Sequence, residues 1–436
     1  MKIQLAIVWL LLGLGFGYSG SAQNNATEPL TVSETIRLVV QNNSTLREAI
    51  DALAVIEAKV EQSRSYLSPT VHAEASYARI GPTSVFDIPD LGSFQLFPVN
   101  NYDAHIGARY VLYDFHRTAK TIDLALSQID SAVDRRELLK RDLEFQAAQL
   151  FYAILFLQDN CHVQDEHIQM LNEHLDVAKR KLASGTATEL EVLSTQTRVV
   201  TARNQKLELE NMLAKQTITL RRLMGRGDQT PLLLVGDPAY TAVSQSTDEL
   251  IRTALQKRLE VQSIKNLVKT NTVQYDLTKL RDKPVIDLNA LAGVKNGYIP
   301  NLDKPILNFA LALAANIPIF DGHLTRQQLA EVSANGKILA DRARETEELI
   351  RADVLQAVAD SETSGNALRL VEINIEQSQK ALEFARARYE AGTVTNLDLI
   401  DALEACSMTR LQKLQALFKC VSSMLNLRRA VGEAIL

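Results

Sequence analysis

The chain contains one structural unit twice. Residues 175–225 align without a gap on residues 382–432, at a constant distance of 207 residues. The match is clearest between LASGTATELEVL at 182–193 and YEAGTVTNLDLI at 389–400. A period this long excludes the solenoids, whose repeats have about 20 to 50 residues. The fold and the function must therefore be read from a duplicated unit.

The first 22 residues predict a secretory signal peptide. Lys2 supplies the basic start, residues 3–16 are apolar, and residues 20–22 are the small residues typical of a cleavage site. The residue directly after this site is Gln23 and not cysteine, which argues against a lipid-anchored N-terminus. The mature protein is therefore expected to leave the cytoplasm.

After the signal peptide, no segment of the sequence is apolar enough to cross a membrane as a helix. The longest apolar run, residues 148–157, has about half of the roughly 20 residues that a spanning helix needs. If the chain crosses a membrane, strands must cross it.

The composition argues against several classes of function. A net charge of -5, from 47 basic and 52 acidic residues, gives no reason to expect nucleic acid as a partner. The three cysteines are no disulfide framework, and Cys406 and Cys420 are predicted to be small buried apolar residues. The sequence lacks a phosphate-binding glycine loop, a His-Glu-x-x-His pair and a nucleophile elbow. It therefore predicts no enzyme, no metal site and no cofactor.

Four segments alternate between apolar and polar or small side chains, as strands do, at 69–79, 102–113, 284–294 and 307–319. The first and third begin with a proline, which suits the start of a strand. Each has about 11 residues, enough to cross a bilayer at a tilt of about 45°. Taken alone, the pattern also fits an ordinary soluble sheet.

Two very long helices follow the strand pairs. Residues 114–184 contain neither proline nor glycine, which predicts a helix of about 70 residues and roughly 105 Å. A second helix is predicted over about 322–391, weakened by two internal glycines, Gly336 and Gly365. Both helices end where glycine can adopt the positive φ of a C-terminal cap, at Gly185-Thr186 and Gly392-Thr393.

A new helix starts after each Gly-Thr pair, on a capping-box pattern: Thr188 with Glu191, and Thr395 with Asp398. Shorter helices are expected at about 45–67 and 260–280. Each repeat is thus a strand hairpin followed by a long helical hairpin, the latter at about 114–224 and 320–432. The predicted organisation is a signal peptide (1–22), a first repeat (23–225), a linker (226–258) and a second repeat (259–436).

A four-stranded sheet in lipid has two unpaired edges, and each unpaired backbone group there costs several kcal/mol. One chain cannot close such a sheet into a barrel, so several copies must share it. This reasoning predicts a homo-oligomer with a hollow barrel and a helical bundle projecting to one side. From the residues alone, 8, 12 or 16 strands remain open.

The exported start, the paired strand and helical hairpins and the two G-T-x-T-x-L-[DE] segments resemble the TolC-like outer-membrane efflux proteins, over essentially the whole mature chain. The resemblance implies a mixed α and β membrane protein: a homotrimer with a 12-stranded barrel in outer-membrane lipid and a periplasmic helical tunnel. It also implies that a periplasmic adaptor and an inner-membrane pump are partners. The exported cargo, drugs, metals or polypeptides, stays open, and the runner-up hypothesis is an exported coiled-coil structural or adhesion protein without a channel.

The resemblance also implies which residues close the tunnel and which residues dock on the periplasmic adaptor. The gate residues are Tyr389, Asp398, Asp401 and Glu191, and the docking tips are Gly185, Thr186, Gly392 and Thr393. Val394 stands where the family has a latch arginine, and Arg388 or Lys181 are the candidate substitutes. From the residues alone, Glu191 and Asp398 also fit helix capping, and Tyr389 also fits packing between the hairpins.

Two further segments carry expectations. A polar cluster on the first long helix is predicted to be a solvated face, with metal binding by His162 and Glu166 as the alternative; it comprises Cys161, His162, Asp165, Glu166, His167 and His174. The loop 81–101 is longer than its counterpart 295–304 and is expected to cover the outer mouth.

Overall fold

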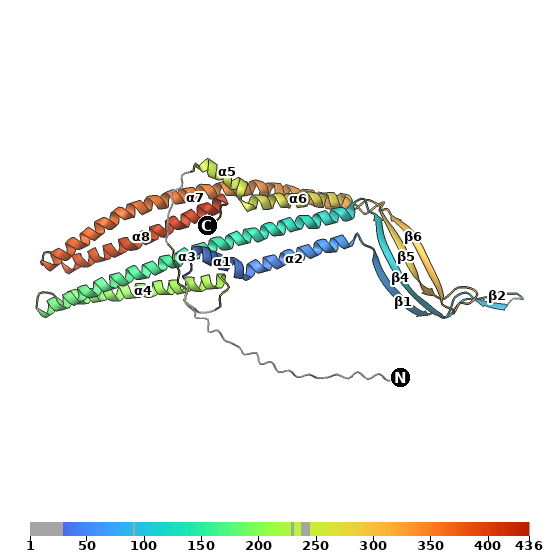
Figure 1. The fold of residues 1–436 in the computed structure, drawn as a ribbon, viewed down its shortest axis with the longest axis horizontal. Coiled ribbons are helices and arrows are strands. Elements are labelled where there is room, and N and C mark those ends of the chain that lie inside the picture. Colours follow the sequence, from blue (N-terminus) through green and yellow to red (C-terminus); the bar gives the residue numbers. More distant parts are fainter. Residues whose placement is uncertain (1–28, 90–91, 228–230, 237–244, 436) are drawn as a thin grey trace, which may run out of the picture.

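The protein is an elongated rod of long helices with a small sheet at one end (Figure 1). The structure, a computed structural model, describes residues 29–89, 92–227, 231–236 and 245–435. The predicted signal peptide lies outside these residues. None of the helices in the described ranges combines the length and the apolar character that crossing a membrane requires.

The four long strands form one antiparallel sheet in the order β1-β4-β5-β6. They are β1 (Thr70–Arg79), β4 (Asn100–Tyr113), β5 (Val285–Lys295) and β6 (Ile306–Asn316). The last strand ends three residues before the sequence pattern does, just before Ile317-Pro318, and proline has no N–H for the ladder. The pairing of β4 with β5 joins the two repeats.

The register of this sheet separates apolar side chains from charged ones, apart from Arg79 at the end of β1. One face carries apolar residues on all four strands, among them Val71, Tyr77, Ile106, Tyr110, Leu288, Val294, Leu307, Phe309, Leu311 and Leu313. Phe309 is 84% exposed and Ile106 is 60% exposed. A water-soluble sheet buries its apolar face, so this exposed apolar face requires a nonpolar environment.

The segment predicted as a loop at 81–101 contains a small hairpin of β2 (Val85–Ile88) and β3 (Gly92–Gln95). Phe86 faces Phe94 across it, and both side chains are exposed. The hairpin projects beyond the end of the sheet that is far from the helices (Figure 1). The sequence prediction missed these strands because they are only four residues long.

Two helices of 67 residues each, α3 (Arg117–Ala183) and α7 (Leu324–Glu390), form the length of the rod. At 1.5 Å per residue, each is about 100 Å long. Their return helices are α4 (Glu189–Leu223) and α8 (Asn396–Val431). The helix α7 continues through both of the glycines that weaken it in sequence, because α6 and α8 pack along its length.

Both long helices begin on the same turn. Oδ2 of Asp114 accepts hydrogen bonds from the backbone N–H and the hydroxyl of Thr118, at 2.7 and 2.5 Å. Asp321 does the same for Thr325 at 2.8 and 2.6 Å. The N-cap residue of each helix is a histidine with positive φ (66° and 67°).

Shorter helices complete the rod. The helices α2 (Ser44–Ser65) and α6 (Leu259–Lys279) run beside α3 and α7, while α1 (Val32–Asn42) and α5 (Thr247–Lys257) lie near its middle (Figure 1). The helices α1 and α5 were not predicted from the sequence. A core of Val39, Phe151, Leu220 and Met224 fixes α1 against α3 and α4, and Cys406 and Cys420 are buried as expected.

The helices form an open row at each level of the rod. Near the sheet, α2 packs on α3, α3 on α6 and α6 on α7; near the far end, α4 packs on α3, α3 on α8 and α8 on α7. The outermost helices keep exposed apolar side chains, Leu193, Val200 and Leu207 on α4 and Leu370, Ile373 and Phe384 on α7. One chain therefore leaves both sides of every row uncovered.

Candidate functional site at the helical tips

Both helix-to-helix turns lie at the end of the rod opposite the sheet (Figure 1). The first turn closes when the N–H of Thr186 donates to Lys181 O at 2.9 Å and the N–H of Gly185 donates to Leu182 O at 3.0 Å. The second turn repeats this pattern, with Thr393 donating to Arg388 O and Gly392 to Tyr389 O. These are Schellman caps, which require the positive φ of 74° at Gly185 and 73° at Gly392.

The two predicted capping boxes are present in the structure. The N–H of Glu191 donates to Thr188 Oγ1 at 3.3 Å, and the carboxylate of Glu191 accepts from the Thr188 N–H at 3.4 Å. Asp398 makes the same exchange with Thr395, and its carboxylate is 2.8 Å from the Thr395 nitrogen. The hydroxyl of Thr395 and then its N–H lower the pKa of Asp398 by hydrogen bonding to the ionised form. Both predicted gate acids on the caps therefore stabilise the starts of α4 and α8.

Tyr389 lies inside the tip, where it joins the two hairpins. Its side chain is 5% exposed and packs edge-on against His174 of α3, at 5.1 Å between ring centroids. The Lys181 ammonium lies 3.8 Å from the centre of the tyrosine ring and donates to Tyr389 O at 3.0 Å. Burial, followed by the charge of Glu191, raises the pKa of Tyr389. Lys181 thus pairs with Tyr389, and the apolar Val394 packs in the same cluster.

His174 and Asn396 form a buried polar link that the sequence reasoning missed. His174 Nε2 lies 2.6 Å from Asn396 Oδ1, and the Asn396 amide also reaches Thr195 Oγ1 at 3.4 Å. This link connects α3, α8 and α4. Burial lowers the pKa of His174 despite the hydrogen bond to Asn396.

The expectation of a solvated face is wrong for His167 and His174, which are both 6% exposed. The two histidines are seven residues apart, on the same stripe as the buried Leu171 and Ala178, and this heptad spacing was the available signal. The alternative metal pair was His162 and Glu166. The Glu166 carboxylate lies 3.6 Å from His162 Nε2, but it also accepts a hydrogen bond from Arg410 at 2.7 Å.

Asp401 differs from the other gate candidates. It lies one turn after Asp398 on α8, its side chain is exposed, and within the described part of the chain it makes no hydrogen bond or ion pair. Nearby, Arg198 of α4 donates to Glu404 of α8 at 2.8 Å and ties the two hairpins together. Asp401 is therefore the candidate gate acid whose carboxylate has no hydrogen bond or ion pair to the described residues.

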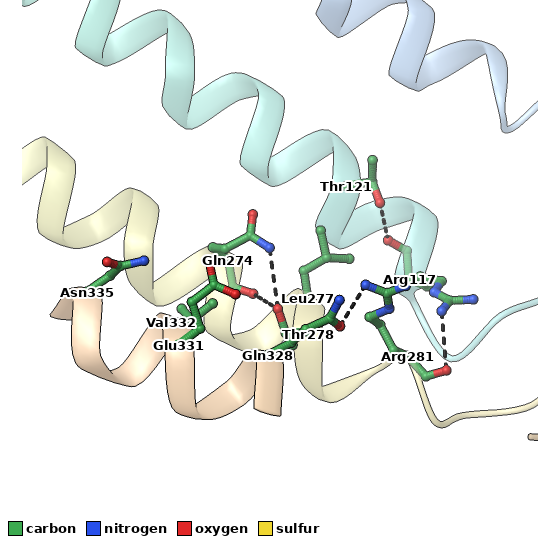
Figure 2. Close-up of a pocket in the computed structure, with 10 residues that line it drawn as sticks. All are labelled: Arg117, Thr121, Gln274, Leu277, Thr278, Arg281, Gln328, Glu331, Val332 and Asn335. Carbon is green, nitrogen blue, oxygen red and sulfur yellow. Dashed lines mark hydrogen bonds between the residues drawn. The ribbon is translucent and has the colours of Figure 1, made fainter. Parts of the chain in front are cut away.

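A hollow of about 490 Å³ lies at the other end of the rod, where α3, α6 and α7 meet the sheet (Figure 2). Arg117 donates to Arg281 O at 3.3 Å, and Arg281 donates to Gln328 Oε1 at 2.7 Å. These bonds use the polar groups to join the three helices. We therefore interpret the hollow as part of the structural junction between the helices and the sheet.

Comparisons with known proteins agree with this architecture. The profile described as outer membrane efflux protein matches residues 35–226 and 250–433, which means that it matches both repeats. The chain is 22% identical over 406 residues to the probable efflux pump outer membrane protein TtgC of Pseudomonas putida, covering 92% of this chain and 82% of TtgC. It is 22% identical to the pyoverdine export outer membrane protein OpmQ of the same species, covering 76% of this chain and 70% of OpmQ.

Among solved structures, the outer membrane protein VceC of Vibrio cholerae superposes with a TM-score of 0.77 at 17% identity, covering 93% of this chain and 97% of VceC. The sheet at one end, the paired long helices and the double match to one family profile have a single explanation. The chain belongs to the outer membrane efflux protein family, whose TolC-like members are outer-membrane channels with a periplasmic helical domain.

Proposed function

We propose that three copies of this chain close into one outer-membrane conduit, a 12-stranded barrel continued by a periplasmic helical tunnel. The observation that carries this proposal is that every layer of the chain is an open row with two uncovered sides. A ring of copies covers both sides of every layer at once. The proposal treats residues 23–225 and 259–436 as the two repeats and residues 226–258 as the linker between them.

The unpaired edges of the sheet are the strongest reason to expect that several copies close into one barrel. Among the described residues, the strands β1 and β6 each pair with a single strand, although the exposed apolar face of the sheet suits lipid. In hydrocarbon, each backbone group left unpaired costs several kcal/mol. Pairing β1 of one copy with β6 of the next satisfies both edges, and three copies of the four-stranded sheet give twelve strands.

The helices support the same closure. The exposed residues Leu193, Val200 and Leu207 are spaced by seven along α4, as in a coiled-coil seam. Leu370 and Phe384 on α7 have twice that spacing. In the ring, the α4 stripe of one copy meets the α7 stripe of its neighbour, which buries both.

The conduit is the exit duct of an export system and carries out no chemical reaction of its own. In this proposal the Gly-Thr turns at Gly185 and Gly392 dock on a periplasmic adaptor, which links the duct to an inner-membrane pump. Tyr389, Asp398, Asp401 and Glu191 surround the narrow end. The related proteins are named for efflux and for pyoverdine export, so more than one class of cargo suits this architecture.

Light scattering of the detergent-extracted protein, corrected for bound detergent, tests the assembly. The expected mass is three times that of the mature chain, with little monomer. Single-channel conductance in a planar bilayer tests the duct. A monodisperse monomer that does not conduct would refute the shared barrel.

A further inference from the structure

Except for Arg79 at the end of β1, the charged side chains of the sheet form one band on the face opposite the apolar one. The band contains three carboxylates, two permanent cations and two histidines: Glu74, Asp103, Asp287, Arg109, Lys295, His72 and His105. The residues come from β1, β4 and β5, and β6 adds no charged residue to either face. In the proposed barrel, where the apolar face meets lipid, this band lines the lumen.

His105 lies between two carboxylates. Its Nδ1 is 3.0 Å from Asp103 Oδ1, and its Nε2 is 3.7 Å from Glu74 Oε2. A neutral imidazole has one N–H and carries no charge, whereas the imidazolium has an N–H on each nitrogen and a positive charge that both carboxylates attract. The Lys295 ammonium lies 3.6 Å from the other oxygen of Asp103. The geometry therefore accommodates a protonated His105.

His72 lies opposite a glycine on the neighbouring strand. It pairs with Gly107 across β1 and β4, and a Cβ on Gly107 would lie 2.6 Å from His72 Nε2. Only glycine leaves room for the ring in this position. On the same face, the guanidinium of Arg109 on β4 donates a hydrogen bond to the Asp287 carboxylate on β5 at 2.9 Å.

The sign of the band depends on these two histidines. With both neutral, three carboxylates against two cations leave one net negative charge per chain. With both protonated, the balance becomes one net positive charge. Histidine is the side chain whose charge ordinarily changes between about pH 5 and 8.

We infer that His72 and His105 set the ion preference of the barrel lumen, so that it favours cations at neutral pH and shifts toward anions in acid. The inference rests on the proposed function, because it requires the closed barrel. Fixed wall charges act over the Debye length, which is about 30 Å at 10 mM salt and about 3 Å at 1 M. The pH-dependent change in ion preference is therefore expected at low salt and not at high salt.

The test uses the full-length protein in planar bilayers under a KCl gradient, at about pH 7.5 and about pH 5.5. In roughly 10 mM salt, the cation-to-anion permeability ratio of the unmodified protein should fall on acidification by about twofold or more, and near 1 M the change should vanish. The His72→Gln/His105→Gln variant keeps every acid at the tips and should lose this change. His105→Lys should show the lower ratio already at the higher pH.

His162→Gln is the matched control, because His162 lies on α3 outside the sheet and is 78% exposed. A pH response that is equal in the unmodified protein and in the double glutamine variant would overturn the inference while leaving the conduit intact. Protein that inserts as a monomer and never conducts would overturn the conduit and this inference together.

Discussion

Lys181 of the first repeat lies on the ring of Tyr389 of the second, with its Nζ 3.8 Å from the ring centroid and 3.0 Å from the tyrosine carbonyl oxygen. In the alignment of the repeats, Lys181 corresponds to Arg388, the neighbour of Tyr389. The two repeats thus share a backbone plan but contribute different side chains to one contact. This contact joins the hairpins of a single chain at the tip.

Replacing Lys181 by methionine should loosen the tip. The change removes a cation–π contact and a hydrogen bond, each of which is worth about 1 kcal/mol. Resting conductance in planar bilayers should rise, while the trimer mass stays unchanged. Lys179→Met, on the exposed side of the same turn, is the control and should leave conductance as it was. Equal conductance in the two variants would show that this contact does not hold the tip closed.

Acid should destabilise the helical tips through His174 and His167. Burial lowers the pKa of both imidazoles, so the unfolded chain binds protons more readily than the folded chain does. Stability should therefore be lost as the pH falls below about 6.5, the ordinary histidine value, toward the lowered pKa. Heat-modifiable migration of the oligomer should show a lower transition temperature at pH 5.5 than at pH 7.5.

A variant comparison isolates this histidine contribution. His167→Gln with His174→Gln should flatten the pH dependence between those two values, even if the double variant is less stable throughout. The exposed His162→Gln should retain it. A slope that survives in the buried double variant would assign the acid sensitivity to other groups.

Asp401 should determine the ion selectivity of the narrow end. In the proposed trimer, threefold symmetry would bring several carboxylates together there, and like charges in a constriction focus a negative potential. Asp401→Asn together with Asp398→Asn should weaken cation selectivity and block by divalent cations. Asp401→Asn alone should account for most of the change, because Asp398 is occupied in its capping box. An unchanged reversal potential in the double variant would mean that these acids only cap the helix.

Replacing Gly185 or Gly392 by valine should reduce export without causing the trimer to dissociate. An added Cβ meets nothing within 4 Å at either site, so the damage must come from the positive φ alone. A β-branched residue there costs roughly 1–2 kcal/mol and distorts the turn. Gly227→Val is the control, since Gly227 also has open space but no positive φ. Export assays in a strain that lacks other conduits measure the loss, and full export in both tip variants would exclude the turns as the docking surface.

Periodicity and capping residues were sufficient to predict the large elements. The long helices followed from uninterrupted helix formers, and both tips from Gly-Thr pairs followed by capping boxes, because these signals are local in sequence. The small hairpin β2–β3 and the middle helices α1 and α5 were missed, since short elements carry few repeats of their pattern.

The tip contacts could not be predicted in the same way. His174 and Asn396 are 222 residues apart, and nothing local indicates that one hydrogen bond joins them. Lys181 was a candidate substitute for the latch arginine, but its contact with the Tyr389 ring was not predicted, because lysine on a helix end ordinarily points into water. Which side chains meet across the two repeats depends on how the hairpins pack.

The equal length of α3 and α7 has a consequence for how such a protein can change. Both begin on an Asp-x-x-x-Thr turn at the sheet and end on a Schellman cap, so the two tips lie the same helix length away from the sheet. Removing one heptad from α3 and α4 alone would leave the first turn about 10 Å short of the second. In a ring of three such chains, three long helical hairpins would alternate with three short ones. Adapting this duct to a narrower or wider periplasm therefore requires matched changes in all four helices.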